Sequence, residues 1–141
     1  MRARDLALLS DAAYAAGDIA RRFWRKGARQ WDKADGAGPV TEADLAINDM
    51  LADSLRNARP DYGWLSEESP DAAPRLAARR TFIIDPIDGT RAFIAGEKTF
   101  AHSLAIADQG RIVAAVVYLP IHDTLYAATD DGAAIDRKAH V

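Results

Sequence analysis

The chain has 141 residues, of which 49% are hydrophobic and 28% charged, with a formal net charge of −3 and no cysteine. A chain of this length and composition fits one compact domain with a packed core. The negative charge argues against nucleic acid or an anionic membrane surface as a partner, and the absence of cysteine excludes disulfides and thiolate metal sites.

Two helices are predicted in the first 60 residues. Apolar residues recur at spacings of three and four over 3–26, which indicates a long amphipathic helix. Acidic residues interrupt this stretch, so we reject a signal peptide. The absence of cysteine suits a reducing cytoplasm, where we expect the protein. Glycines and charged residues over 30–39 predict an exposed, mobile loop. A second helix is predicted over 41–58, since Thr41 and Asp44 form a capping-box pattern before another apolar stripe.

The hydrophobic pattern changes to short strand-like runs after the second helix. Strands are predicted over 62–65, 81–84, 100–107, 111–119 and 122–128, with one or two helical turns over 88–95. The sequence Asp108-Gln109-Gly110 is typical of a hairpin turn, so the sheet should be largely antiparallel. The predicted fold class is α+β, with two helices packed on one face of a largely antiparallel sheet. No stretch approaches the roughly 20 apolar residues of a membrane span.

A possible cation site follows the predicted strand over 81–84. Asp85 stands at the strand end, where its carboxylate can point out of the sheet edge. Pro86 stiffens the turn and lacks an N–H group, which could aim the carbonyl of Ile87 at a cation. Carboxylates, a carbonyl and water are the ligands that Mg²⁺ selects. The segment is therefore suited to a hard divalent cation.

A possible anion site comes directly after it. Asp88 is predicted to be the N-cap of the helical turns over 88–95. The N–H groups of Gly89 and Thr90 would then be free of partners within the helix. Because a helix N-terminus attracts negative charge, these donors could hold a phosphate group beside the cation.

Residues 85–90, Asp-Pro-Ile-Asp-Gly-Thr, resemble the signature of the lithium-sensitive phosphatases of the inositol monophosphatase superfamily. Residues 65–69 resemble the acidic motif of that superfamily, and residues 40–44 resemble its conserved helix start. The resemblance implies the layered αβαβα fold of the sugar phosphatases. Residues 1–136 would form its N-terminal metal-binding domain and residues 137–141 a truncated tail, with the second α/β domain absent.

The resemblance also implies a metal centre of two or three Mg²⁺ ions. The first ion would be held by Glu67, Asp85 and the carbonyl of Ile87. Asp85 would bridge to a second ion that it shares with Asp88. In this arrangement one ion lowers the pKa of the attacking water and the other stabilises the leaving oxygen.

The implied catalytic residues surround that centre. Thr90 and Asp44 would form a hydrogen-bonded pair that helps Glu67 activate the water, and the backbone N–H groups of Gly89 and Thr90 would hold the substrate phosphate. These motifs contain no histidine or cysteine nucleophile, and the resemblance requires no covalent phospho-enzyme.

Four further residues have competing interpretations. Glu67 and Glu68 could together form a solvated acidic turn; of the two, Glu67 aligns with the metal ligand, and Glu68 is the one whose part in the site is open. Lys33 either approaches the substrate or a third cation, or is a solvated lysine. Arg91, next to the phosphate-binding turn, is a candidate for reading a second phosphate or a carboxylate. His102 is interpreted as a core or interface residue in preference to a metal ligand.

The expected function is Mg²⁺-dependent hydrolysis of a small phosphate monoester by metal-activated water, and the expected partner is a small phosphorylated metabolite. Inositol phosphate and 3′-phosphoadenosine 5′-phosphate are the candidate substrate types, and Leu65-Ser66 before the Glu pair is more typical of bisphosphate nucleotidases. Two alternatives are a histidinol-phosphate phosphatase, suggested by residues 91–96, and a non-catalytic interaction module. We also expect a homodimer, and a chain that is an incomplete, weakly active or inactive fragment, since the superfamily takes one more metal ligand from its second domain.

Overall fold

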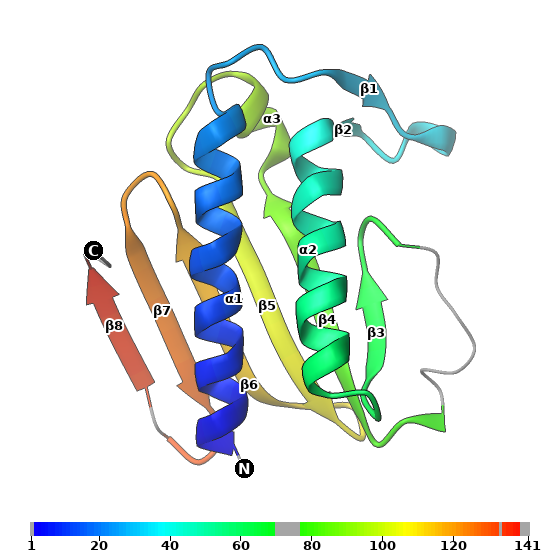
Figure 1. Ribbon diagram of the computed structural model, residues 1–141, viewed down its shortest axis with the longest axis vertical. Helices are drawn as coiled ribbons and strands as arrows, with labels where there is room; N and C mark the ends of the chain where they lie inside the picture. The colour runs from blue at the N-terminus through cyan, green and yellow to red at the C-terminus, as the bar shows by residue number, and fades with distance from the viewer. Residues whose placement is uncertain (1, 70–76, 133, 139–141) are drawn as a thin grey trace.

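Two long helices cover one face of a six-stranded sheet in the computed structural model, which describes residues 2–69, 77–132 and 134–138. Helices α1 (Arg2–Phe23) and α2 (Glu42–Ala58) pack against each other in front of the sheet (Figure 1). The strands lie in chain order: β3 (Gly63–Ser66), β4 (Arg80–Asp88), β5 (Ala101–Asp108), β6 (Arg111–Leu119), β7 (Thr124–Thr129) and β8 (Ala134–Lys138). Only β3 and β4 pair in parallel; the other neighbours are antiparallel. The predicted α+β fold is therefore confirmed.

The core lies between the two helices and the inner face of the sheet. Its fully buried large aliphatic and aromatic side chains come from both layers: Leu9, Ile47, Leu51, Leu55, Phe82, Ile84, Phe100, Leu104, Ile106, Tyr118 and Leu125, with His102 beside them. The alternation of buried and exposed residues along β6 and β7 shows that one face of the sheet is packed and the other is open. None of the helices in the described part of the chain is long and apolar enough to cross a bilayer.

Helix α2 begins at the predicted capping box. The Thr41 hydroxyl accepts hydrogen bonds from the backbone N–H groups of Ala43 and Asp44, at 3.1 and 3.3 Å. The Asp44 carboxylate in turn accepts from the Thr41 N–H at 2.9 Å. This reciprocal pairing satisfies N–H groups that the first helical turn leaves without partners. It also fixes the position of a carboxylate that is fully buried.

The predicted loop over 30–39 is instead a small paired structure. Strand β1 (Gln30–Asp32) runs antiparallel to β2 (Pro39–Thr41), with a 3₁₀ turn, η1 (Ala34–Gly36), between them. The Lys33 N–H closes the hairpin by donating to the Gly38 carbonyl at 2.8 Å. Exposure was predicted correctly, but the irregular backbone was not, because the pairing partners have no hydrophobic alternation that would reveal them.

Strand β4 is longer than predicted and contains a β-bulge. Asp85 pairs with Ser103 of β5, and Asp88 pairs with Ala101, so two residues of β4 lie opposite the single residue His102. A bulge of this kind bends its strand and changes the direction of the side chains beside it. The predicted turn after residue 84 is thus a distorted continuation of the strand.

Helix α3 (Thr90–Ile94) begins two residues later than predicted. Asp88 was expected to be its N-cap, but Asp88 is the last residue of β4, and Gly89 takes the N-cap position with a φ of 92°. Glycine adopts this left-handed conformation without the steric cost that an aspartate carries. The prediction for Asp88 was therefore wrong. The helix has only 5 residues, fewer than the predicted turns over 88–95, so its macrodipole is smaller than the prediction assumed.

Helix α1 approaches β6 closely at Gly17. A Cβ atom built on Gly17 would lie 2.6 Å from Cε2 of Tyr118. The Tyr118 ring is held from its other end, because its hydroxyl donates to Asp123 at 2.6 Å. The missing side chain of Gly17 thus sets the distance between the helix and the sheet.

We expect Gly17→Ala to lower the free energy of unfolding by about 1–2 kcal/mol, because overpacking outweighs the roughly 1 kcal/mol that alanine gains in helix propensity. Chemical denaturation of the wild type and the variant measures the difference. Asp11→Ala, at an exposed position of the same helix, is the propensity control and should not destabilise. A Gly17→Ala protein as stable as the wild type would contradict this packing argument.

Candidate functional site

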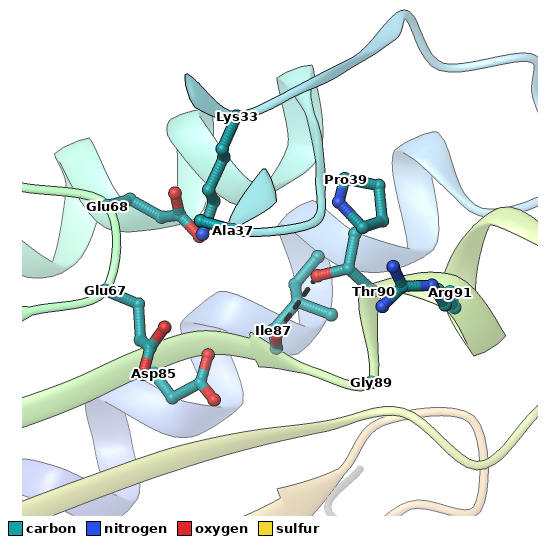
Figure 2. A pocket seen from close by; sticks show the side chains of 10 residues that line it. All are labelled: Lys33, Ala37, Pro39, Glu67, Glu68, Asp85, Ile87, Gly89, Thr90 and Arg91. Atoms are coloured by element: carbon teal, nitrogen blue, oxygen red, sulfur yellow. Dashed lines mark hydrogen bonds and ion pairs between the residues drawn. The ribbon is translucent and has the colours of Figure 1, made fainter. Parts of the chain in front are cut away.

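A pocket of about 340 Å³ opens where β4, the acidic turn after β3 and the β1–β2 hairpin meet (Figure 2). Most of the residues predicted for the site line it, together with Ala37 and Pro39: Lys33, Glu67, Glu68, Asp85, Ile87, Gly89, Thr90 and Arg91. Two predicted residues do not line it. Asp44 is buried behind Thr90, and Asp88 is exposed at the end of its strand.

Glu67 and Asp85 form the acidic wall of this pocket. Because β3 and β4 run in parallel, their carboxyl ends lie side by side, and the Glu67 N–H donates to the Ile84 carbonyl at 3.1 Å. Figure 2 shows the two carboxylates turned toward each other. Burial, followed by the negative charge of Glu67 and then of three further carboxylates, raises the pKa of Asp85 to about 7. A cation between the two groups would relieve this repulsion.

A hydrogen-bond network fixes the acidic turn against α2. The Ser66 hydroxyl donates to the Asn48 side-chain oxygen at 2.5 Å, and the Asn48 amide donates to the Ser69 hydroxyl at 2.9 Å. The Trp64 indole also donates to Ser69, at 3.1 Å, and the Glu68 N–H donates to Ser66 at 3.3 Å. Sequence reasoning missed Asn48. Its signal was a polar residue within the buried stripe of a helix, since buried polar groups need partners.

Thr90 and Asp44 form the pair that the family resemblance implied. The Thr90 hydroxyl donates to Oδ1 of Asp44 at 2.9 Å, while the other oxygen of Asp44 accepts from both the N–H and the hydroxyl of Thr41. The Thr90 hydroxyl oxygen also lies 3.3 Å from the carbonyl of Ile87. A hydroxyl whose proton is directed at a buried carboxylate keeps its lone pairs available to accept a hydrogen bond from the pocket.

Lys33 crosses the pocket from the hairpin and pairs with Glu68. Its Nζ lies 3.0 Å from Oε2 of Glu68, and the two side chains are only 24% and 7% exposed. Interpreting Lys33 as a solvated lysine, or Glu68 as part of a solvated acidic turn, does not agree with this geometry. Burial nevertheless raises the pKa of Glu68, and the ion pair with Lys33 only partly offsets that effect.

Arg91 gives the pocket a separate positive end. Its side chain is exposed, and the structure describes no ion pair between it and another described residue. Its two terminal nitrogens lie 3.6 and 3.7 Å from the position that a Cβ atom on Gly38 would occupy. The pocket is therefore acidic at Glu67 and Asp85 and basic at Arg91.

The donor set on the acidic side fits a hard cation. Glu67, Asp85 and the carbonyl of Ile87 offer only oxygen atoms, which Mg²⁺ prefers to nitrogen or sulfur. Among the residues the structure describes, no three acidic, histidine or cysteine side chains already stand close enough to form a complete metal cluster. Asp88, the predicted ligand of a second ion, stays outside the pocket lining.

Comparisons with known proteins place the chain in a family. The model of the inositol monophosphatase family matches residues 2–140. An inositol-1-monophosphatase of Rhizobium meliloti (strain 1021) is 37% identical over 139 residues, which cover 96% of this chain and 52% of that protein. The 3′(2′),5′-bisphosphate nucleotidase CysQ of Escherichia coli O157:H7 is 37% identical over 82% of this chain and 48% of its own length.

A solved structure shows the same fold. The extragenic suppressor protein suhB from Bartonella henselae superposes with a TM-score of 0.87 at 33% identity, covering 98% of this chain and 54% of that one. The chain thus spans about half the length of the relatives it matches. The family model, the sequence relatives and the shared fold show that the chain belongs to the inositol monophosphatase family.

Proposed function

We propose that this chain takes part in the Mg²⁺-dependent hydrolysis of a small phosphate monoester by an activated water molecule. The observation that carries the proposal is the pair of facing carboxylates, Glu67 and Asp85, at a pocket that Thr90 also lines, with its hydroxyl bonded to the buried Asp44. The names of the relatives, an inositol-1-monophosphatase and a bisphosphate nucleotidase, support a phosphatase.

The carboxylates and one carbonyl would hold the cation. Glu67, Asp85 and the Ile87 carbonyl supply oxygen ligands, and Asp88 would contribute to a second ion from the end of β4. When bound, Mg²⁺ would lower the pKa of a coordinated water and neutralise charge on the phosphate. The protein's part is to keep these ligands in place and to keep their negative charges close together before the cation arrives.

Thr90 would orient the attacking water. The Thr90 hydroxyl directs its proton at Asp44, so the hydroxyl oxygen is available to accept a hydrogen bond from a water molecule in the pocket. Glu67, on the opposite wall, would accept the proton that the water releases. Gly89 and Thr90 line the pocket, and their backbone N–H groups would donate to the substrate phosphate.

The charge of the pocket favours one substrate type. The exposed guanidinium of Arg91 would attract a second anionic group, as in a bisphosphorylated nucleotide, and would repel the ammonium group of histidinol phosphate. Inositol phosphate has only hydroxyl groups to offer there. A non-catalytic interaction module would gain nothing from two facing carboxylates, because crowding like charges in a half-buried site costs free energy unless a cation is bound.

Without metal, Asp85→Asn is expected to stabilise the protein at neutral and alkaline pH. The pKa of Asp85 is about 7 in the folded chain against an ordinary 3.8, so the folded state binds its proton more tightly between these values. The free energy of unfolding therefore falls as the pH rises through this window, and the Asn variant lacks that fall. We expect a gain of about 1–2 kcal/mol near pH 8, after allowance for solvent screening, and none near pH 4, measured by chemical denaturation.

With Mg²⁺ added, the wild type should become more stable than Asp85→Asn. The cation should raise the melting temperature of the wild type by mass action on the folded state, and leave Asp85→Asn nearly unchanged. Asp53→Asn, which removes an exposed carboxylate from α2, is the matched control and should respond like the wild type. A wild type that shows no Mg²⁺ response, or an Asp85→Asn protein that responds fully, would refute the metal site.

Arg91→Ala should weaken the preference for a second phosphate. Isothermal titration in Mg²⁺ would compare 3′-phosphoadenosine 5′-phosphate with adenosine 5′-phosphate. We expect the ratio of the two affinities to fall roughly 10-fold in the variant, since a charge-assisted hydrogen bond is lost. Arg22→Ala, at an exposed site on α1, is the charge-matched control. An unchanged ratio in Arg91→Ala would rule out this role for the guanidinium.

A further inference from the structure

One buried histidine lies directly opposite the bulge in β4. The bulge places Pro86 and Ile87 across from His102, between the two aspartates of the motif. The His102 side chain is fully buried on the core face of β5. It is therefore the residue of the neighbouring strand best placed to control how the motif leaves the sheet.

The His102 imidazole bonds to the backbone of the bulge. Its Nδ1 lies 2.6 Å from the carbonyl oxygen of Pro86. A carbonyl can only accept, so Nδ1 carries the proton. The other ring nitrogen, Nε2, is buried and has no hydrogen-bond partner among the residues described. The ring packs between Phe100 and Tyr118, with centroids 6.3 Å from each.

Packing alone does not account for this histidine. An apolar side chain would fill the same space without leaving Nε2 unmatched, and buried polar groups without partners cost free energy. It would, however, remove the donor to the Pro86 carbonyl. Pro86 lies between the paired positions of the bulge, outside the regular register, and it has no N–H with which to pair. The imidazole thus supplies a contact that the backbone at the bulge lacks.

We propose that His102 is a positioning residue, whose Nδ1–H holds the Pro86 carbonyl so that the Asp85 carboxylate and the Ile87 carbonyl keep the orientation that binds a cation. The link to the cation rests on the proposed function. The link to the backbone does not, because the hydrogen bond to Pro86 joins two groups of this chain alone. His102 itself would not contact substrate or metal.

Two substitutions distinguish the hydrogen bond that the imidazole donates from the packing of its ring. His102→Leu removes the N–H, whereas His102→Asn can place an amide N–H near the position of Nδ1. Leu125→Ala, in the core under β7 and away from the bulge, is the control for general loss of stability. Isothermal titration with Mg²⁺, well below the melting temperature of each protein, gives the affinity. We expect His102→Leu to bind at least 10-fold more weakly than the wild type, and His102→Asn and Leu125→Ala to stay within about 3-fold.

Amide hydrogen exchange at Ile87, Asp88 and Gly89 gives a readout that needs no metal. In His102→Leu, exchange at these amides should accelerate at least 10-fold relative to amides in β6, and His102→Asn should restore it. If the wild type binds no Mg²⁺, the proposed function fails, while this exchange pattern would still support the backbone role. The positioning role is overturned if His102→Leu binds Mg²⁺ and exchanges like the wild type, or if His102→Asn is no better than His102→Leu.

Discussion

The site depends on two like charges that the fold holds face to face. Parallel pairing of β3 with β4 puts Glu67 beside Asp85. Burial and the neighbouring carboxylate make ionisation of Asp85 unfavourable and raise its pKa to about 7. A hydrophobic core and a hydrogen-bonded frame must supply the free energy that keeps them there. Such an arrangement reduces stability where no cation is bound, and strained or repulsive groups of this kind concentrate at functional sites.

The frame that holds this pair comes from both layers of the fold. Helix α2 contributes Asp44, which joins the capping box to Thr90, and Asn48, which fastens the acidic turn. The sheet contributes His102, which bonds to the bulge from the neighbouring strand. The β1–β2 hairpin closes the third side with Lys33. Three separate segments therefore fix the pocket, and each does so through a buried or half-buried polar contact.

The sequence predicted those features that local pattern controls. Helical periodicity, the Thr41–Asp44 box and the motif at 85–90 all depend on residues close in the chain, and the structure brings most of the predicted site residues to one pocket. The bulge opposite His102 and the Lys33–Glu68 ion pair depend on strand register and on contacts between distant segments, for which the sequence has no local signal. The N-cap of α3 was wrongly assigned to Asp88, because aspartate is a good capping residue and stands one position before Gly89. The N-cap of this helix has a left-handed backbone, which glycine adopts most easily.

An Mg²⁺ titration followed by amide NMR tests the cation site most directly. If Glu67 and Asp85 hold the ion, saturable shifts should gather at residues 67–68 and 85–90, and should extend to Thr41 and Asp44 through the Thr90 contact. The same titration of Asp85→Asn should lose them. The absence of saturable shifts at these residues, or shifts spread over the acidic surface in proportion to exposure, would show that the facing carboxylates do not form a cation site.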